Sequence, residues 1–242
     1  MPPPRVKRFY ETAAAVNADG GYHIALDGKP VRTPGGQTVL LANRALADAL
    51  AAEWDAQRPH IDLPRMGLNQ LVNAAIDRGR ADRAALADEL IAYGNTDLLC
   101  YRAEGPPALV ARQTAAWDPV LDWAGARYGV RLKVTSGIVA IEQDAPAMGA
   151  LGAEVLKADP FQLTALRAAV GICGSLIVGL AAAEGCLDAG QAWRTVNVDE
   201  DWQREKWGED PQAVSNRADA FAAFSHAVHM LRLLQVLESE SH

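Results

Sequence analysis

The sequence predicts an α+β fold in which a small β-rich N-terminal domain is followed by a larger, mostly helical C-terminal domain. Alternating apolar residues and closely spaced glycine turns fill residues 6–42, which is typical of short strands. From Asn43 onward the apolar residues recur at helical spacing instead. Strands followed by helices indicate an α+β protein or two adjoining domains.

Short strands are expected first. Tyr22, Ile24 and Leu26 alternate with His23 and Ala25, the period of a strand with one buried face. Glycine-containing turns at residues 19–21, 27–28 and 34–36 separate this strand from its neighbours. Further strands are expected at residues 9–16 and 38–41, so the region forms a meander of three to five strands.

Helices are expected from Asn43, a suitable N-cap residue. The first helix places Leu46, Leu50 and Trp54 on one face. A second is expected to end at Gly79 and a third to be capped by Asp82. We place the domain boundary between residues 59 and 82, dividing the chain into 1–75 and 76–242.

Four further helical features are expected in the C-terminal domain. A helix over residues 108–128 should be kinked or split by Pro119. Residues 168–183 carry no charge but fall short of the ~20 residues that a membrane span needs, so we interpret them as one buried helix. Asp188 should cap the helix that carries the acidic stretch. The last helix, residues 212–237, should bury one apolar side: Val214, Phe221, Phe224, Val228 and Leu231.

Composition excludes several function classes. The chain has 242 residues, half of them apolar, which is enough for one large or two smaller cores. A net charge of −7 argues against nucleic-acid binding, since Arg5, Lys7 and Arg8 form only a small basic cluster. Three widely spaced cysteines indicate neither a disulfide framework nor a zinc site. No secretory signal or membrane insertion is expected, and reduced thiols fit a cytoplasmic location.

Motifs for nucleotide or covalent chemistry are not found. There is no P-loop and no GxGxxG after a strand. Residues 171–175 resemble a nucleophile elbow only loosely, because Ser175 stands where glycine is required, so Cys173 is expected to be a buried structural thiol. His226 and His229 lie three apart on the last helix, but ordinary helix histidines are favoured over metal ligands. We expect no metal and no cofactor.

The stretch at residues 197–210, NVDEDWQREKWGED, is the candidate site. On a helix, Asp199, Gln203 and Trp207 lie four apart and therefore share one face, while Glu200 and Trp202 flank it. Carboxylates, an amide and indoles suit contact with a basic, partly apolar partner surface. The other interpretation is a solvated helix end whose tryptophans enter the core, and the residues leave both open.

Two alternatives to a partner surface also remain open. The acids between Asp199 and Glu205 could serve a carboxylate-dependent hydrolase, although adjacent acids on a helix point to different faces and no nucleophile is evident. A general helical adaptor is the second alternative. Asp97 is either a turn and cap residue or part of a site with Arg102, which could pair with the acidic stretch or with a partner.

Eight stretches together resemble one known family. They are RFY (8–10), LDGKPVRTP (26–34), EWDAQ (53–57), NAAID (73–77), TDLLCYR (96–102), WDP (117–119), GS (174–175) and QREKWG (203–208). They resemble the assembly chaperones that hold the alpha subunit of the F-type ATP synthase catalytic head before it joins the beta subunit. The stretches span nearly the whole chain.

The resemblance implies a chaperone rather than an enzyme, with no nucleotide hydrolysis. It implies the free alpha subunit as partner, a monomer when unbound, and a bacterial cytoplasmic member, since no Arg- and Ser-rich leader is evident. It also implies an essential acid before the WG pair, which we place at Asp199 with Glu200 as a near substitute. The expected partner-binding residues are Asp199, Glu200, Gln203, Trp202, Trp207, Asp97, Arg102 and Trp54.

Overall fold

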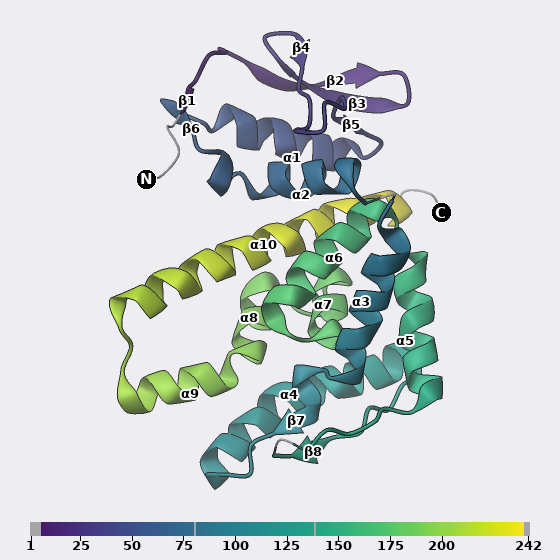
Figure 1. Cartoon of the computed structure of the whole chain (residues 1–242), viewed down its shortest axis with the longest axis vertical. Coiled ribbons are helices and arrows are strands. Elements are labelled where there is room, and N and C mark those ends of the chain that lie inside the picture. The colour runs from purple at the N-terminus through teal and green to yellow at the C-terminus, as the bar shows by residue number, and fades with distance from the viewer. Residues whose placement is uncertain (1–5, 80, 138, 240–242) are drawn as a thin grey trace.

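A computed structural model describes residues 6–79, 81–137 and 139–239 and confirms the α+β prediction. Figure 1 shows the N-terminal sheet at one end, with α1 (Arg44–Asp55) and α2 (Gly67–Asp77) covering it and the remaining helices stacked beyond them. The predicted boundary at residue 75 falls inside α2 and stays a prediction. Arg5 of the basic cluster lies outside the described residues.

The main sheet is built around one central strand. Its strands are β2 (Ala13–Ala18), β3 (Gly21–Leu26), β4 (Lys29–Pro30) and β5 (Leu40–Leu41). Antiparallel pairing joins β3 to β2 along its whole length, and β4 and β5 share the opposite edge of β3 at its two ends. Ile24 and Leu26 point into the core. The strand predicted at 9–16 begins only at Ala13, because Asp27 binds the backbone amides of Glu11 and Thr12 instead.

Three smaller elements complete this region and its link to the helices. β1 (Val6–Lys7) pairs with β6 (His60–Ile61), and a short 3₁₀ turn, η1 (Leu63–Arg65), precedes α2. Asn43 caps α1 as predicted: its Oδ1 accepts from Leu46 N at 2.8 Å, and its Nδ2 donates to the Leu233 carbonyl at 2.9 Å. The second helix ends before Gly79, and Asp82 precedes the third without a side-chain cap bond.

The C-terminal part is a helical bundle with one short parallel strand pair. Its elements are α3 (Arg83–Asn95), η2 (Leu98–Cys100), β7 (Tyr101–Arg102), α4 (Pro107–Tyr128), β8 (Thr135–Ser136), α5 (Ala145–Lys157), α6 (Pro160–Cys173), α7 (Leu176–Ala183), α8 (Ala189–Val196), α9 (Val198–Trp207) and α10 (Pro211–Ser239). The long helix α10 packs against α6, α2, α1 and α8 and so joins both parts of the molecule (Figure 1). In the described part of the chain, no helix is long and apolar enough to cross a membrane.

The prediction of a single buried helix over residues 168–183 is wrong. The chain breaks between α6 and α7, where Gly174 has φ +70° and Ser175 caps α7 through a 3.0 Å bond from Val178 N. The break lets α7 fold back onto α6. A Cβ on Gly179 would lie 2.6 Å from Val170 Cγ2, so glycine is required for this close approach.

Three other helix predictions need correction. Pro119 does not split α4: residues 107–128 form one helix, and Pro119 lies at an exposed position inside it. Asp188 caps α8, and the acidic stretch forms a separate helix after Asn197. Of the five residues predicted to be buried on α10, Phe224, Val228 and Leu231 are buried, while Val214 and Phe221 are exposed because the first turns of the helix extend beyond the bundle.

Candidate partner-binding site

The acidic stretch forms α9 and the turn into α10. All ten residues of α9 lie in the described part of the chain, and none of them is buried. Figure 1 shows α9 at the edge of the bundle, joined by the 208–210 turn to the projecting start of α10, and α9 contacts α4 and α8. A helix without a buried face depends on its polar contacts to stay in place.

Among the acids of α9, Asp199 is the one that bonds to a fully buried side chain. Its Oδ1 accepts from Gln113 Nε2 of α4 at 2.7 Å, and the Gln113 side chain is fully buried. The Gln113 Oε1 in turn accepts from the Ala103 amide at 2.8 Å. Asp199 therefore links α9 to a buried amide.

The other acids of α9 are engaged in ion pairs. Asp201 accepts from Arg217 of α10 at 2.6 Å and from Arg204 at 3.0 Å. Glu205 pairs with Arg112 of α4 at 2.8 Å, and this bond lowers the pKa of the Glu205 carboxyl. Glu200 lies 3.5 Å from Arg217, with two thirds of its side chain exposed. Glu200 is thus the most accessible acid of the DED run at 199–201.

The two tryptophans of α9 differ in environment. Trp202 is half-buried between two cations: Arg112 Cζ lies 4.8 Å and Lys206 Nζ 4.9 Å from its ring centroid. Trp207 is 77% exposed, the highest value among the large apolar side chains that the structure describes. Neither indole enters the core, so the interpretation of α9 as a helix end with buried tryptophans is wrong.

A groove of about 1060 Å³ lies between α9, α8, the first turns of α10 and the end of α6. Part of its lining is small or apolar and includes Gly171, Ile172, Gly174 and Val196. Ile172 is 37% exposed. The groove therefore offers apolar surface to a partner.

The rest of the groove lining is mainly polar, with more acidic than basic residues. Four carboxylates and two guanidinium groups line it: Asp199, Glu200, Glu209, Asp210, Arg204 and Arg217. Gln203 and the exposed Trp207 add an amide and an indole. A lining that combines apolar residues with an excess of acids is complementary to a basic, partly apolar surface.

Three predicted contact residues lie inside the protein instead. Asp97 is fully buried and accepts from Ser175 Oγ at 2.8 Å and from Ile177 N at 3.0 Å, and burial raises its pKa to about 6. Arg102 is 7% exposed and pairs with Asp118 at 2.7 Å, not with the acidic stretch. Trp54 is 8% exposed in the N-terminal part. Asp97 and Arg102 therefore hold the break before α7 and the η2 turn in place.

No cluster of three His, Cys, Asp or Glu side chains able to hold a metal ion occurs among the residues described. Cys100 and Cys173 are buried, and burial raises the pKa of each thiol to about 12, so both are unreactive. Sequence reasoning missed Arg112, Gln113 and Arg217, which hold α9. Only their three-dimensional neighbours reveal this role, since Arg112 and Gln113 lie 93 and 86 positions from their partners on α9, and Arg217 lies on the next helix, 16 positions from Asp201.

Comparison with known proteins places this architecture in a family. The model of the family described as ATP12 chaperone protein matches residues 7–125. The crystal structure of Atp12 from Paracoccus denitrificans is 40% identical, with 94% of this chain and 98% of that chain covered and a TM-score of 0.89. An aspartate-to-lysine mutant of the same Atp12p gives 39% identity, 94% and 97% coverage and a TM-score of 0.88. The mitochondrial protein atp12 of Schizosaccharomyces pombe is 28% identical over 234 residues, covering 89% of this chain and 79% of the relative. This chain belongs to the ATP12 chaperone family.

Proposed function

We propose that this chain binds the free alpha subunit of the F-type ATP synthase catalytic head and prevents its aggregation until it pairs with the beta subunit. Membership of a chaperone family supports the first part and excludes an enzyme, so the carboxylate-dependent hydrolase is set aside. The ion pairs that engage Asp201 and Glu205 also argue against a carboxylate pair acting on a small substrate.

The groove beside α9 is the observation that favours partner binding most. A subunit that normally pairs with another exposes a large apolar patch while it is alone. The apolar residues of the groove lining provide apolar area, and Trp207 adds a large exposed ring. Indoles are frequent anchors of protein interfaces. Glu200, Gln203 and Trp207 are the proposed contact residues, with Trp202 at their edge.

The acidic residues that line the groove would orient a basic partner during its approach. Charges at the edge of an interface raise the association rate and discriminate between partners more than they add affinity. A basic rim on the client would therefore be guided toward α9. We place this activity in a bacterial cytoplasm, because the solved Atp12 structures to which the chain is similar come from a bacterium.

The test is size-exclusion chromatography of the chain with freshly refolded alpha subunit, with light scattering to follow aggregation. Co-elution and suppressed scattering, both lost when beta subunit is added, are expected. A general helical adaptor would instead bind unrelated unfolded proteins equally well. No complex and unchanged aggregation would refute the proposal.

A matched pair of charge reversals tests the site. Glu200→Lys should weaken alpha-subunit binding and its association rate, with an effect that decreases as salt rises. Asp19→Lys changes the net charge equally but lies in the exposed β2–β3 turn, so it should leave binding unchanged. Equal effects of both variants would show that overall charge, not the groove, governs the interaction.

A further inference from the structure

The groove beside α9 adjoins a second hollow, of about 530 Å³, which lies between α2, α3, α6 and α10. The two hollows share the exposed Ile172 of α6. On α10 they meet between Ala220, which lines the first, and Ala223, which lines the second. They therefore form one longer depression, which we call the α6 groove, with Ile172 where its two halves join.

The α6 groove follows three helices. Figure 1 shows α6 between α3 and α10, and it contacts both. Each of the three contributes residues to both halves or to their junction: Asp82, Leu86, Glu89 and Thr96 at α3, Thr164, Arg167, Ala168, Gly171 and Ile172 on α6, and Ala213, Asn216, Ala220, Ala223 and His226 on α10. Because α3 has 13 residues, the groove beside it is about 20 Å long. A partner helix of about four turns has the same length.

Gly171 leaves open space at the junction of the two halves. It lies inside α6 and is exposed. A Cβ there would meet only the Tyr93 hydroxyl, at 3.9 Å, which is an ordinary contact distance. Glycine destabilises a helix relative to alanine, and no close contact within the described part of the chain requires it at this position. The open space admits the close approach of another chain.

The lining of the junction suits a helix better than an extended segment. An extended segment would place its main-chain N–H and C=O groups against Gly171, Ile172 and Ala223, whose side chains offer no hydrogen bond. A helix pairs these groups internally and presents only side chains. An exposed Ile172 with a hollow on each side matches helix packing, in which side chains of one helix enter the spaces beside a side chain of the other.

The charge of the lining differs between the two halves. Beside α9, four acids face two arginines, as described above. In the second half, the described lining residues are balanced: Arg78 and Arg167 accompany Asp82 and Glu89, and Arg167 pairs with Glu89 at 3.0 Å. A matching helix is therefore apolar along its middle and basic at one end. A second copy of this chain, with a net charge of −7, fits the acidic half poorly.

We infer that the α6 groove binds one amphipathic helix of the client, with the apolar face of that helix on Ile172, Ala168 and Ala223 and its basic end beside α9. The inference rests on the proposed function in assigning the helix to the alpha subunit. It adds the second hollow to the site and names the mode of recognition, a helix laid in a groove.

A matched pair of substitutions on α10 tests the second half of the groove. Ala223→Leu places a larger side chain in the second hollow and should weaken binding of intact alpha subunit at least about fivefold, because extra methylene groups are costly in a packed contact. Ala222→Leu adds the same groups at the preceding exposed position, which lines neither hollow, and should leave binding unchanged. Equal affinities of Ala223→Leu and wild type would overturn the inference.

Two glycine substitutions separate a partner site from a structural role. Gly149 is also exposed inside a helix, α5, and a Cβ there meets nothing within 4 Å. Gly171→Ala and Gly149→Ala should both leave the midpoint of denaturation unchanged or raise it. Only Gly171→Ala should also weaken binding of the alpha subunit. A lowered midpoint in Gly171→Ala, or unchanged binding, would overturn the inference.

The occupant is identified with overlapping peptides of the alpha subunit, each about 20 residues long so that a helix can form. One peptide should gain helical circular dichroism when it binds the full chain, and Ala223→Leu should weaken it. Binding without a gain in helix would overturn the inference. A dimer of the chain alone, seen by light scattering and lost in Ala223→Leu, would show that a second copy occupies the groove and would also overturn it.

The remaining outcomes separate this inference from the proposed function. A complex with intact alpha subunit that Ala223→Leu does not weaken overturns the helix site and leaves the function standing. A helical peptide that Ala223→Leu weakens, without any complex of the intact subunit, supports the helix site and overturns the function.

Discussion

Asp199 and Glu200 are adjacent acids, and the structure predicts different roles for them: Asp199 holds α9 in place, whereas Glu200 is exposed. Asp199→Ala removes the acceptor for the buried Gln113 amide. Glu200→Ala removes an exposed carboxylate 3.5 Å from Arg217. Both changes delete one negative charge from the first turn of α9, so the lost interaction with the helix dipole is common to both. The difference between the variants therefore reports the Gln113 contact.

The expected magnitudes follow from burial. Leaving the buried Gln113 Nε2 without a partner costs about 1–3 kcal/mol, whereas an exposed ion pair contributes at most about 1 kcal/mol. Because no residue of α9 is buried, the loss should appear as local opening of α9 rather than as global unfolding. An opening equilibrium shifted by this amount accelerates amide exchange roughly 5- to 150-fold.

Hydrogen exchange by mass spectrometry on peptides covering residues 198–207 measures this opening. Asp199→Ala should exchange faster in this segment while the peptides of α6 and α7 keep their wild-type rates. Glu200→Ala should change the exchange of α9 several-fold at most. Unchanged protection in Asp199→Ala, or the same acceleration in both variants, would refute the assignment of Asp199 as the residue that holds α9.

Three further predictions concern the core. The folded pKa of Asp97, about 6, is above the ordinary 3.8, so its stabilising contribution is full below pH 4 and is lost as pH rises to 6. The free energy of unfolding of wild type, measured in urea, should therefore exceed that of Asp97→Asn by more at pH 4 than at pH 7, with a change of up to about 3 kcal/mol. The same difference at both pH values would contradict this. Gly174→Ala should cost about 1–2 kcal/mol in thermal denaturation, because φ is +70° while the nearest atom to a new Cβ is 3.9 Å away. Tyr10→Phe should lower the free energy of unfolding in urea by about 1 kcal/mol, since the Tyr10 hydroxyl donates to the buried Trp54 carbonyl at 2.6 Å. An unchanged free energy would show that water replaces the hydroxyl as donor.

Local patterns predicted the elements whose causes are local. The Asn43 cap and the strand β3 each depend on a few neighbouring residues, and both are confirmed, although burial along β3 does not alternate as predicted, because Ala25 is buried as well as Ile24 and Leu26. The break at Gly174 depends on Asp97, which lies 78 positions from Ser175. Its carboxylate accepts hydrogen bonds from Ser175 Oγ and Ile177 N at the start of α7. A window of apolar residues does not reveal that contact, so the sequence alone predicts one helix over residues 168–183.

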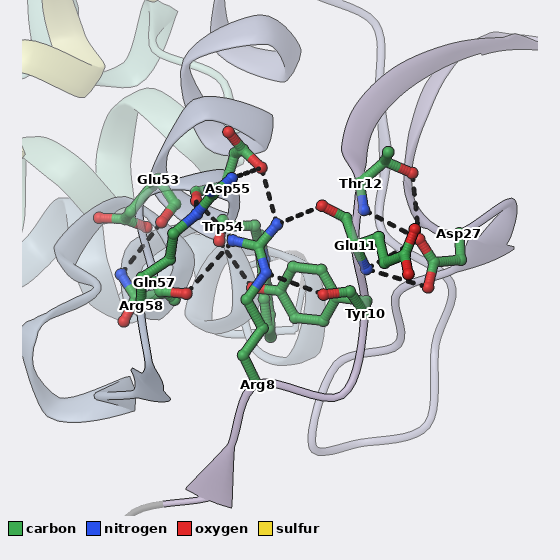
Figure 2. Close-up of polar contacts among 10 residues, drawn as sticks. All are labelled: Arg8, Tyr10, Glu11, Thr12, Asp27, Glu53, Trp54, Asp55, Gln57 and Arg58. Atoms are coloured by element: carbon green, nitrogen blue, oxygen red, sulfur yellow. Dashed lines mark hydrogen bonds and ion pairs between the residues drawn. The ribbon is translucent and has the colours of Figure 1, made fainter.

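Most of the stretches that resemble the family contain polar side chains that connect one element of the fold to another. The Arg8 guanidinium binds Asp55 and the carbonyls of Tyr10, Glu11 and Gln57, which ties the N-terminal segment to α1 (Figure 2). The NAAID stretch supplies Asp77 to the hairpin turn, and TDLLCYR supplies Asp97 to the break before α7. Such links identify the architecture reliably. They identify the partner surface poorly, and this is why Asp97 and Arg102 entered the candidate site from sequence.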